Sequence, residues 1–170
     1  MNGQDKRGAG GIRVAQPADD ALVAQLLIDT FSHLYASMGV EMSLERRAYL
    51  SDQPSRRAFG TSFIYEIDGQ AAGTITAVRP SAQCEAWIDG AWDLRLLAVD
   101  PRMQGRGVAR ALIAEAERWA VEAGATTICL HARRGVQVQA QLYPACGYSR
   151  DIAGDIDGQP FQEGYRKSLA

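Results

Sequence analysis

The chain has 170 residues, of which 46% are hydrophobic, and its 18 Lys and Arg against 20 Asp and Glu give a formal net charge of -2. This length and composition indicate one globular domain with a sizeable core and exclude a disordered, collagen-like or coiled-coil chain. Because there is no basic excess and only 8% of residues are aromatic, the composition also argues against a DNA or RNA partner.

Cysteines and histidines are too few and too scattered for a metal or disulfide site. Cys84, Cys129 and Cys146 are odd in number and lack C-x-x-C spacing, and Cys129 lies in an apolar run that predicts a buried thiol. His33 and His131 have no companion at ligand spacing, so no metal is expected. No run approaches the ~18 apolar residues of a membrane span. A cytoplasmic setting without a membrane partner is therefore expected.

The N-terminal part predicts a tail and a short strand. Residues 1–11 are polar and rich in glycine and have no apolar segment, so a flexible tail is expected before a domain of residues 12–170. Residues 12–15 alternate as a strand that stops at Pro17.

Two helices are expected next. A carboxylate at Asp19 or Asp20 can accept the free amides of a first turn, and apolar residues then recur at helical spacing until Gly39 interrupts them. A shorter helix is expected to begin near Ser43 and to stop near Pro54.

Three strands follow in succession. Residues 62–67 and 71–78 flank Asp68-Gly69, a dipeptide that supplies the positive backbone dihedrals of a tight hairpin. A third extended run covers residues 92–99 and stops at Asp100-Pro101. Three consecutive strands favour antiparallel pairing.

The last third predicts strands and helices in alternation. Residues 107–122 form the strongest helical pattern, with Gly124 at the expected C-terminal cap, and residues 126–131 form an apolar strand. A short helix over residues 136–143 and one or two weakly alternating strands complete the chain. A strand, helix and strand in sequence favour a parallel crossover, so a mixed sheet in one α/β domain is expected.

The segment between the third strand and the long helix carries the chemistry. Gly105 and Gly107 leave the backbone bare where the helix begins, so the amides of residues 104–109 can close around a bulky anion. Arginines add local positive charge, three against one Asp over residues 100–110 (3 − 1 = +2): Arg102, Arg106 and Arg110.

Two other phosphate loops can be tested against this segment. A P-loop needs Lys and then Ser or Thr after its last glycine, whereas Val108 and Ala109 follow Gly107. The dinucleotide fingerprint needs a third Gly or Ala where Arg110 stands, and an acidic residue ending the next strand, which instead ends in His131-Ala132-Arg133. Both loops fail.

Residues 104–109, Gln-Gly-Arg-Gly-Val-Ala, resemble the Q/R-x-x-G-x-G/A motif of the GNAT superfamily of N-acetyltransferases. The order of elements from residue 12 to residue 169 is also similar to that family, so the resemblance covers nearly the whole chain. It implies a single α/β (α+β) domain, with a mixed, mostly antiparallel sheet of six or seven strands flanked by about four helices. It also implies acetyl transfer from acetyl-CoA to a primary amine of a small molecule or peptide.

The resemblance implies that main-chain amides of the loop hold the pyrophosphate. The pantetheine arm would pair with backbone groups of Leu97 and Val99, which a bulge spreads from the neighbouring strand. The positions implied to bind the cofactor are Leu97, Ala98, Val99, Gln104, Gly105, Arg106, Gly107, Val108 and Ala109.

Residues 142–148, Leu-Tyr-Pro-Ala-Cys-Gly-Tyr, resemble the family's late helix motif F/L-Y-x-x-x-G-F/Y, whose tyrosine faces the thioester sulfur. A phenol with a pKa of about 10 can supply a proton to a departing thiolate whose conjugate acid has a pKa of about 8.5. Tyr143 is therefore expected to be the general acid, with a core aromatic as the alternative.

The general base is harder to assign. The family frequently has a Glu at the position of Asp93, whose shorter arm would have to act through water; a solvent-facing Asp is the alternative. Glu85 and Asp89 are weaker candidates. The oxyanion would be stabilised by a backbone amide near Val99.

The chain also departs from the family's pattern. Val136 stands where the family often has an Asn, so Gln137 or Gln139 is expected to substitute, and Pro144 is expected to end the helix early. Aromatic residues are candidates for the acceptor pocket, with ordinary packing as the alternative: Phe31, Tyr35 and Phe161.

Two other functions stay open at this point. One is an acyl-CoA-binding or sensor module of the same fold without turnover, and the other is a nucleotide-binding oxidoreductase fragment. The sequence identifies neither the acceptor nor the oligomeric state, and a homodimer stays open.

Overall fold

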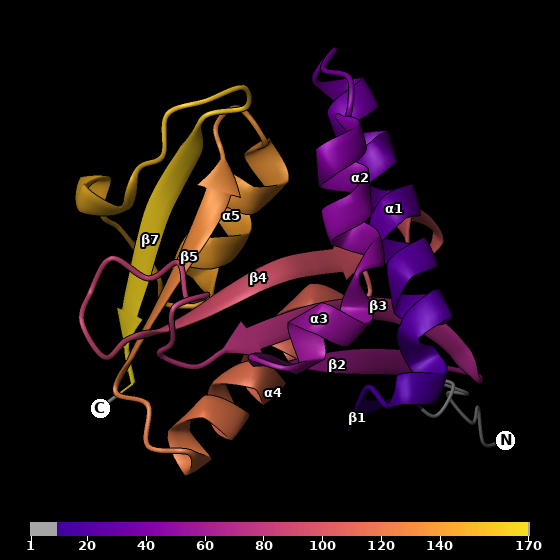
Figure 1. Cartoon of the computed structure of the whole chain (residues 1–170), viewed down its shortest axis with the longest axis horizontal. Coiled ribbons are helices and arrows are strands. Elements are labelled where there is room, and N and C mark those ends of the chain that lie inside the picture. The colour runs from indigo at the N-terminus through magenta and orange to yellow at the C-terminus, as the bar shows by residue number, and fades with distance from the viewer. Residues whose placement is uncertain (1–9, 170) are drawn as a thin grey trace, which may run out of the picture.

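The structure is a computed structural model that describes residues 10–169. These residues form one seven-stranded sheet in the order β1-β2-β3-β4-β5-β7-β6, in which only β4 and β5 pair in parallel (Figure 1). The strands are β1 (Gly10–Val14), β2 (Gly60–Ile67), β3 (Gln70–Val78), β4 (Trp92–Val99), β5 (Thr127–Arg133), β6 (Ser149–Arg150) and β7 (Gln162–Ser168).

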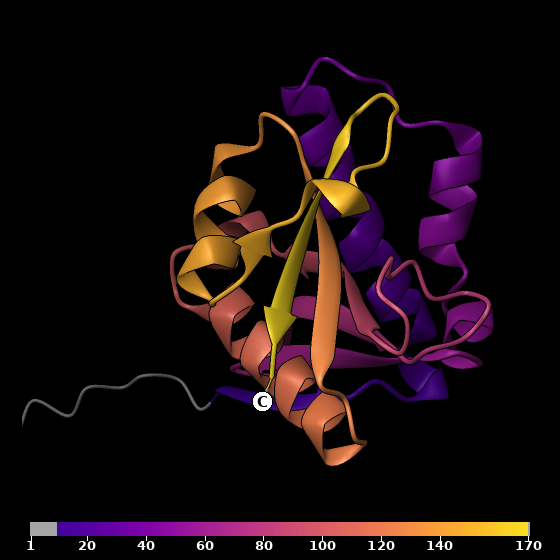
Figure 2. The same ribbon diagram turned by 90° about the vertical axis from the view of Figure 1, so that its left-hand side faces the viewer.

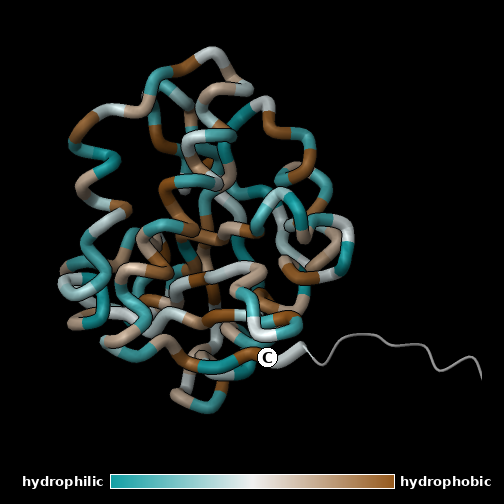
Figure 3. The backbone as a smooth tube through the Cα atoms, turned by 90° about the vertical axis from the view of Figure 1, so that its right-hand side faces the viewer, coloured by the Kyte–Doolittle hydropathy of each residue, from teal (hydrophilic) through white to brown (hydrophobic). Residues whose placement is uncertain are grey.

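Helices cover both faces of the sheet (Figure 2). Side chains of β2 alternate between two cores, because Phe63 faces the cluster built on the long fourth helix and Ile64 faces the cluster built on the first helix. Figure 3 shows apolar and polar residues interspersed along the backbone. The helices are α1 (Asp20–Ser37), α2 (Leu44–Ser51), α3 (Gln53–Arg57), α4 (Val108–Glu122) and α5 (Gln137–Ala145).

The expected fold is confirmed, and several elements have the expected bounds. β4 spans the predicted residues, and the hairpin turn has Asp68 at φ 51° and Gly69 at φ 75°. The apolar face of α4 is buried as predicted, and so is the Cys129 side chain. The tail was expected to extend to residue 11, but β1 already begins at Gly10, where it pairs with β2. Residues 1–9 of that tail lie outside the described residues.

The predicted helix start near Asp19 is right, but the predicted cap is wrong. The Asp19 carboxylate accepts instead from the Gln16 amide at 2.7 Å and from the Arg13 guanidinium at 2.7 Å. These bonds lower the pKa of Asp19 to about 2, the Arg13 bond most. A 3-10 turn over Pro17–Asp19 therefore leads into α1.

One of the two proline predictions needs correction. The second helix ends at Ser51, near Pro54 as expected, and Pro54 itself lies in the first turn of a separate α3, where a missing N–H is tolerated, so residues 10–169 contain five helices. Pro144 does not end α5 at Tyr143, because the helix continues to Ala145 with the proline in its last turn. The C-terminal part of the chain forms two strands, β6 and β7, where one or two were expected.

A glycine in β3 fixes how closely α4 approaches the sheet. A Cβ built on Gly73 would lie 2.9 Å from the Ala98 carbonyl oxygen and 2.9 Å from side-chain carbons of both Leu112 and Val108. Since Val108 begins α4, this contact also positions the N-terminus of that helix against β3 and β4.

We expect Gly73→Ala to destabilise the fold by about 1–3 kcal/mol, because the added methyl overpacks a contact that includes backbone. Urea unfolding followed by tryptophan fluorescence measures the change. Gly11→Ala is the matched strand control, since a Cβ there meets nothing within 4 Å. Equal midpoints for both variants would contradict the packing argument.

Candidate functional site

Strands β4 and β5 separate along their length. They pair only over Trp92–Leu94 and Ile128–Leu130, after which they diverge (Figure 1). On the other side, the register of β3 and β4 shifts between Thr74 and Thr76, and Leu96 adopts a φ of 55°. A bulge with a left-handed leucine therefore bends β4 away from β5, as the resemblance implied.

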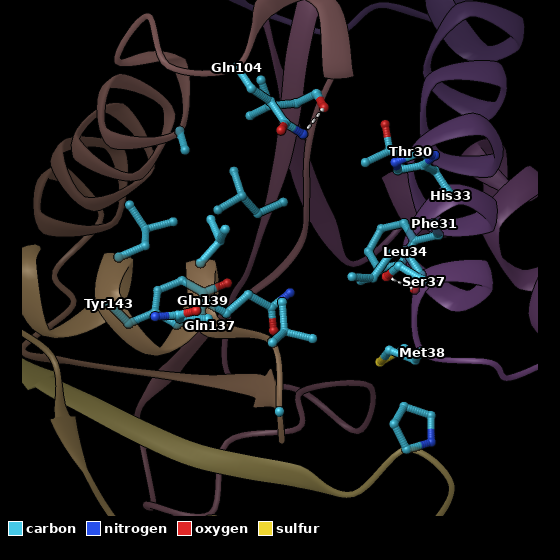
Figure 4. Close-up of a pocket in the computed structure, with 18 of the residues that line it drawn as sticks. Thr30, Phe31, His33, Leu34, Ser37, Met38, Gln104, Gln137, Gln139 and Tyr143 are labelled. Atoms are coloured by element: carbon cyan, nitrogen blue, oxygen red, sulfur yellow. Dashed lines mark hydrogen bonds between the residues drawn. The ribbon is translucent and has the colours of Figure 1, made fainter.

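A cleft of about 1040 Å³ opens where the two strands diverge. In Figure 4, α1 forms one wall with Thr30, Phe31 and Leu34, and the opposite wall carries Gln104 and the α5 residue Tyr143. This volume is at the upper end of the roughly 300–1,000 Å³ that is typical of ligand sites. The cleft can hold a long ligand.

One end of the cleft is the N-terminus of α4. Gly105 at φ 76° and Gly107 at φ 80° turn the backbone here, and a Cβ on either glycine would meet nothing within 4 Å. The main-chain amides of residues 104–109 donate to no acceptor within residues 10–169. Free amides and the helix dipole form an anion site.

The cleft brings together most of the residues that the sequence assigned to the cofactor. All of them line it except Ala98, whose side chain on β4 is buried in the core against α1, and Arg106, which is exposed to solvent. Of the nearby arginines, Arg110 lines the cleft, whereas Arg102 pairs with Asp100 at 2.7 Å.

Tyr143 lies at the inner end of the cleft. Its ring packs at 5.9 Å from Tyr165, and its side chain lines both the cleft and a second, small cavity of about 30 Å³. Burial raises the pKa of Tyr143 to about 12, so the phenol keeps its proton at neutral pH.

His131 lines the same small cavity from β5. Its Nε2 lies 2.9 Å from the Gly154 carbonyl oxygen, which can only accept, so Nε2 carries the proton and Nδ1 carries the lone pair. Burial is the main cause that lowers the pKa of His131 below 6.5. The imidazole is therefore a neutral proton acceptor at pH 7.

The model of the acetyltransferase (GNAT) family matches residues 23–148. The chain belongs to this family. No curated protein matches it in a sequence comparison. Among the described residues no helix is long and apolar enough to cross a membrane, and no three His, Cys, Asp or Glu side chains are grouped to hold a metal.

Solved structures share the fold of this acetyltransferase. A GNAT acetyltransferase of Staphylococcus aureus is 14% identical, with a TM-score of 0.75 over 95% of this chain and 100% of that one. PaiA N-acetyltransferase of Thermoplasma acidophilum, in complex with coenzyme A, is 16% identical, with a TM-score of 0.74 over 95% and 99%. Ribosomal-protein-alanine N-acetyltransferase of Brucella melitensis is 20% identical, with a TM-score of 0.66 over 94% and 99%. The family match over residues 23–148 assigns the chain to the acetyltransferases and not to the oxidoreductase fragment that stayed open from the sequence.

The structure does not bring Asp93 to the cleft. Its side chain is buried, accepts from the Glu85 amide at 2.7 Å and from Arg95 Nε at 2.8 Å, and forms an ion pair with the same guanidinium. Both carboxylate oxygens are thus occupied away from Tyr143, and the expectation that Asp93 is a base loses its geometric support. Glu85 and Asp89 do not line the cleft either.

The other expectations have mixed outcomes. Phe31 and Phe161 line the cleft, whereas Tyr35 does not. Gln137 and Gln139 line it too, and the side-chain amide oxygen of Gln139 accepts from the Arg133 main-chain amide at 2.7 Å, which ties α5 to β5. His131 and Arg133 are not among the expected site residues, although both are polar, stand at the end of the buried strand β5 and line the small cavity.

Asp93→Asn is expected to destabilise the acetyltransferase by about 3–5 kcal/mol, because it leaves the half-buried Arg95 without its carboxylate. Thermal and urea unfolding measure the loss. Asp89→Asn is the control, since that carboxylate is exposed and has no ion pair within residues 10–169. A stable Asp93→Asn protein that has lost turnover would instead restore Asp93 as a catalytic residue.

Proposed function

We propose that this acetyltransferase transfers an acetyl group from acetyl-CoA to the primary amine of a small molecule or peptide. The observation that carries the proposal is the set of free amides of residues 104–109 at the mouth of a long cleft. The solved Thermoplasma relative was crystallised with coenzyme A, which supports the same ligand class here.

The residues at the cleft fit this ligand. Amides around Gly105 and Gly107 would hold the pyrophosphate, and Arg110 beside them adds positive charge. Main-chain groups of Leu97 and Val99 would pair with the pantetheine amides. Gln104 Nε2 now donates to the Val99 carbonyl oxygen at 3.4 Å, a long bond that such a ligand displaces readily.

His131 and Tyr143 supply the two proton transfers. Acetyl-CoA brings its acetyl group as a thioester, and attack by the amine forms the C–N bond and breaks the C–S bond. His131 Nδ1 takes the amine proton, directly or through one water. It thereby has the role of general base that was expected of Asp93. Tyr143 gives its phenolic proton to the thiolate and regains one from solvent. The products are an N-acetylated amine and the coenzyme A thiol.

Gly107→Ala is expected to weaken acetyl-CoA binding by about 10-fold, since an L-residue at φ 80° is strained and shifts the amides. Calorimetric titration with acetyl-CoA measures this. Gly124→Ala at the other end of α4 is the control, because Gly124 has a φ of 94° and equally open space for a Cβ. No saturable binding to the unaltered protein would overturn the proposal.

Tyr143→Phe is expected to lower kcat by about 10²–10⁴-fold while acetyl-CoA affinity stays within about twofold, because only the proton donor is lost. Release of the coenzyme A thiol with an accepted amine measures kcat. Tyr165→Phe, whose ring lies 5.9 Å away, is the matched control. Unchanged kcat would remove the acid role, and acetyl-CoA binding without turnover on any amine would favour the sensor alternative.

The pH profile tests His131. Because its pKa is lowered below 6.5, it acts as a base above that pKa, and kcat at saturating substrates falls as pH drops through it. Tyr143, with a pKa of about 12, causes no alkaline fall below pH 10. His131→Gln is expected to abolish this acidic limb, whereas Tyr143→Phe retains it. An identical limb in His131→Gln would assign the base elsewhere.

A further inference from the structure

Two arginines beside the site have no anionic partner. The guanidinium groups of Arg46 on α2 and Arg133 on β5 form no ion pair and donate no hydrogen bond within residues 10–169. The Nε atom of each is buried and has no acceptor. A buried donor without an acceptor is costly, so it calls for an explanation.

The other arginines that are at least half-buried are satisfied. Arg95 pairs with Asp93 and Arg57 pairs with Asp20. Arg56, which is fully buried, donates to the Gln53 side chain and to the carbonyl oxygens of residues 49 and 50. The fold therefore supplies acceptors to its buried guanidinium groups elsewhere, and Arg46 and Arg133 are exceptions.

The two arginines meet on one aromatic ring. The guanidinium carbon of Arg46 lies 5.2 Å from the Phe31 ring centre and that of Arg133 lies 4.8 Å from it. Tyr49 adds a second ring at 5.3 Å from Arg46, and Tyr35 one at 5.5 Å from Arg133. These rings hold both planar groups in place without neutralising them.

Arg133 adjoins the small cavity beside Tyr143, and Arg46 is joined to it through the Phe31 ring that both guanidinium groups contact. Arg133 lines the small cavity together with His131 and Tyr143, and Phe31 lines both this cavity and the cleft. An anion on Arg133 and a group beside Tyr143 therefore fit within one small molecule.

The charges also repel each other. Burial is the main cause that lowers the pKa of Arg46, and the positive charge of Arg133 lowers it further. The carboxylate of Glu85 acts in the opposite direction but is exposed and pairs with Arg95 at 3.5 Å. Two like charges held together in a partly dry site are stabilised when an anion binds between them.

We propose that Arg46 and Arg133 bind a carboxylate of the acceptor, so that the acceptor is an amino-acid-like molecule whose amine and carboxylate are close together. This inference rests on the proposed function. A flat carboxylate matches the donor fork of a guanidinium, because its two oxygens can accept two parallel N–H bonds.

Binding of product-like probes tests the inference without knowledge of the acceptor. N-acetyl-L-alanine, N-acetyl-L-leucine and N-acetyl-L-phenylalanine are titrated against their carboxamides, by ligand-observed NMR on protein saturated with coenzyme A. At least one acid is expected to bind about 10-fold more tightly than its amide. Arg46→Gln and Arg133→Gln are expected to remove the difference, and Arg133→Lys to retain part of it.

Arg47→Gln is the matched control, because Arg47 is the exposed neighbour of Arg46 on the same helix. The Arg47→Gln variant is expected to prefer the acids over the carboxamides as strongly as the unaltered protein does. Thermal unfolding separates a structural role: loss of an unpaired buried charge is expected to leave Tm unchanged or raised. A lowered Tm with the acid preference intact would overturn the inference.

Equal binding of acids and amides, or no binding of any acid at 10 mM, would also overturn the inference of a carboxylate site. Failure of the proposed function is detected by a different measurement, the titration with acetyl-CoA alone. A protein that binds acetyl-CoA and acetylates L-amino-acid amides as well as L-amino acids would keep the proposed function and lose the carboxylate site.

Discussion

The separation of β4 from β5 is the constraint on which the site depends. Past Leu94 and Leu130 each strand keeps one neighbour and loses the other, so main-chain groups face a cavity. Two glutamine side chains occupy part of this edge, since Gln104 donates to the Val99 carbonyl and Gln139 accepts from the Arg133 amide. Leu96 at φ 55° is the strained residue in the bulge that opens the gap, and strain of this kind persists where the surrounding packing enforces it.

The gap explains why elements far apart in the sequence share one cleft. Helix α4 begins at its mouth because Gly73 lets the helix lie directly against β3, and α1 closes the other side with Phe31 and Leu34. Helix α5 is tied to β5 by Gln139, which places Tyr143 at the inner end. Each wall is thus fixed to the sheet by packing or by a hydrogen bond, and the site is built on rigid elements.

Local patterns predicted the parts of the site that are local. The two glycines before α4 specify a turn with positive φ and bare amides, which depends only on neighbouring residues. The role of Asp93 could not be predicted, because Arg95 lies two residues away on the same strand, and whether the pair is buried depends on the loop that contributes the Glu85 amide. Arg46 and Arg133 lie 87 positions apart (133 − 46), and only the packing of α1 brings both to Phe31. Long-range proximity of this kind leaves no signal in one sequence.

Some positive groups near the site are neutralised by the fold and others are not. Asp93 cancels Arg95 inside the fold, which leaves no net charge from that pair beside the reacting atoms. Free amides lie at the α4 N-terminus at one end of the cleft, and Arg133 lies beside the small cavity at the inner end, with Arg46 on the same Phe31 ring. His131 and Tyr143, which line the small cavity beside Arg133, are both neutral at pH 7. A ligand pair with an anion at each outer end and a neutral amine and thioester at the centre is therefore electrostatically complementary to the site. The same unpaired arginines lower the stability of the protein when no ligand is bound.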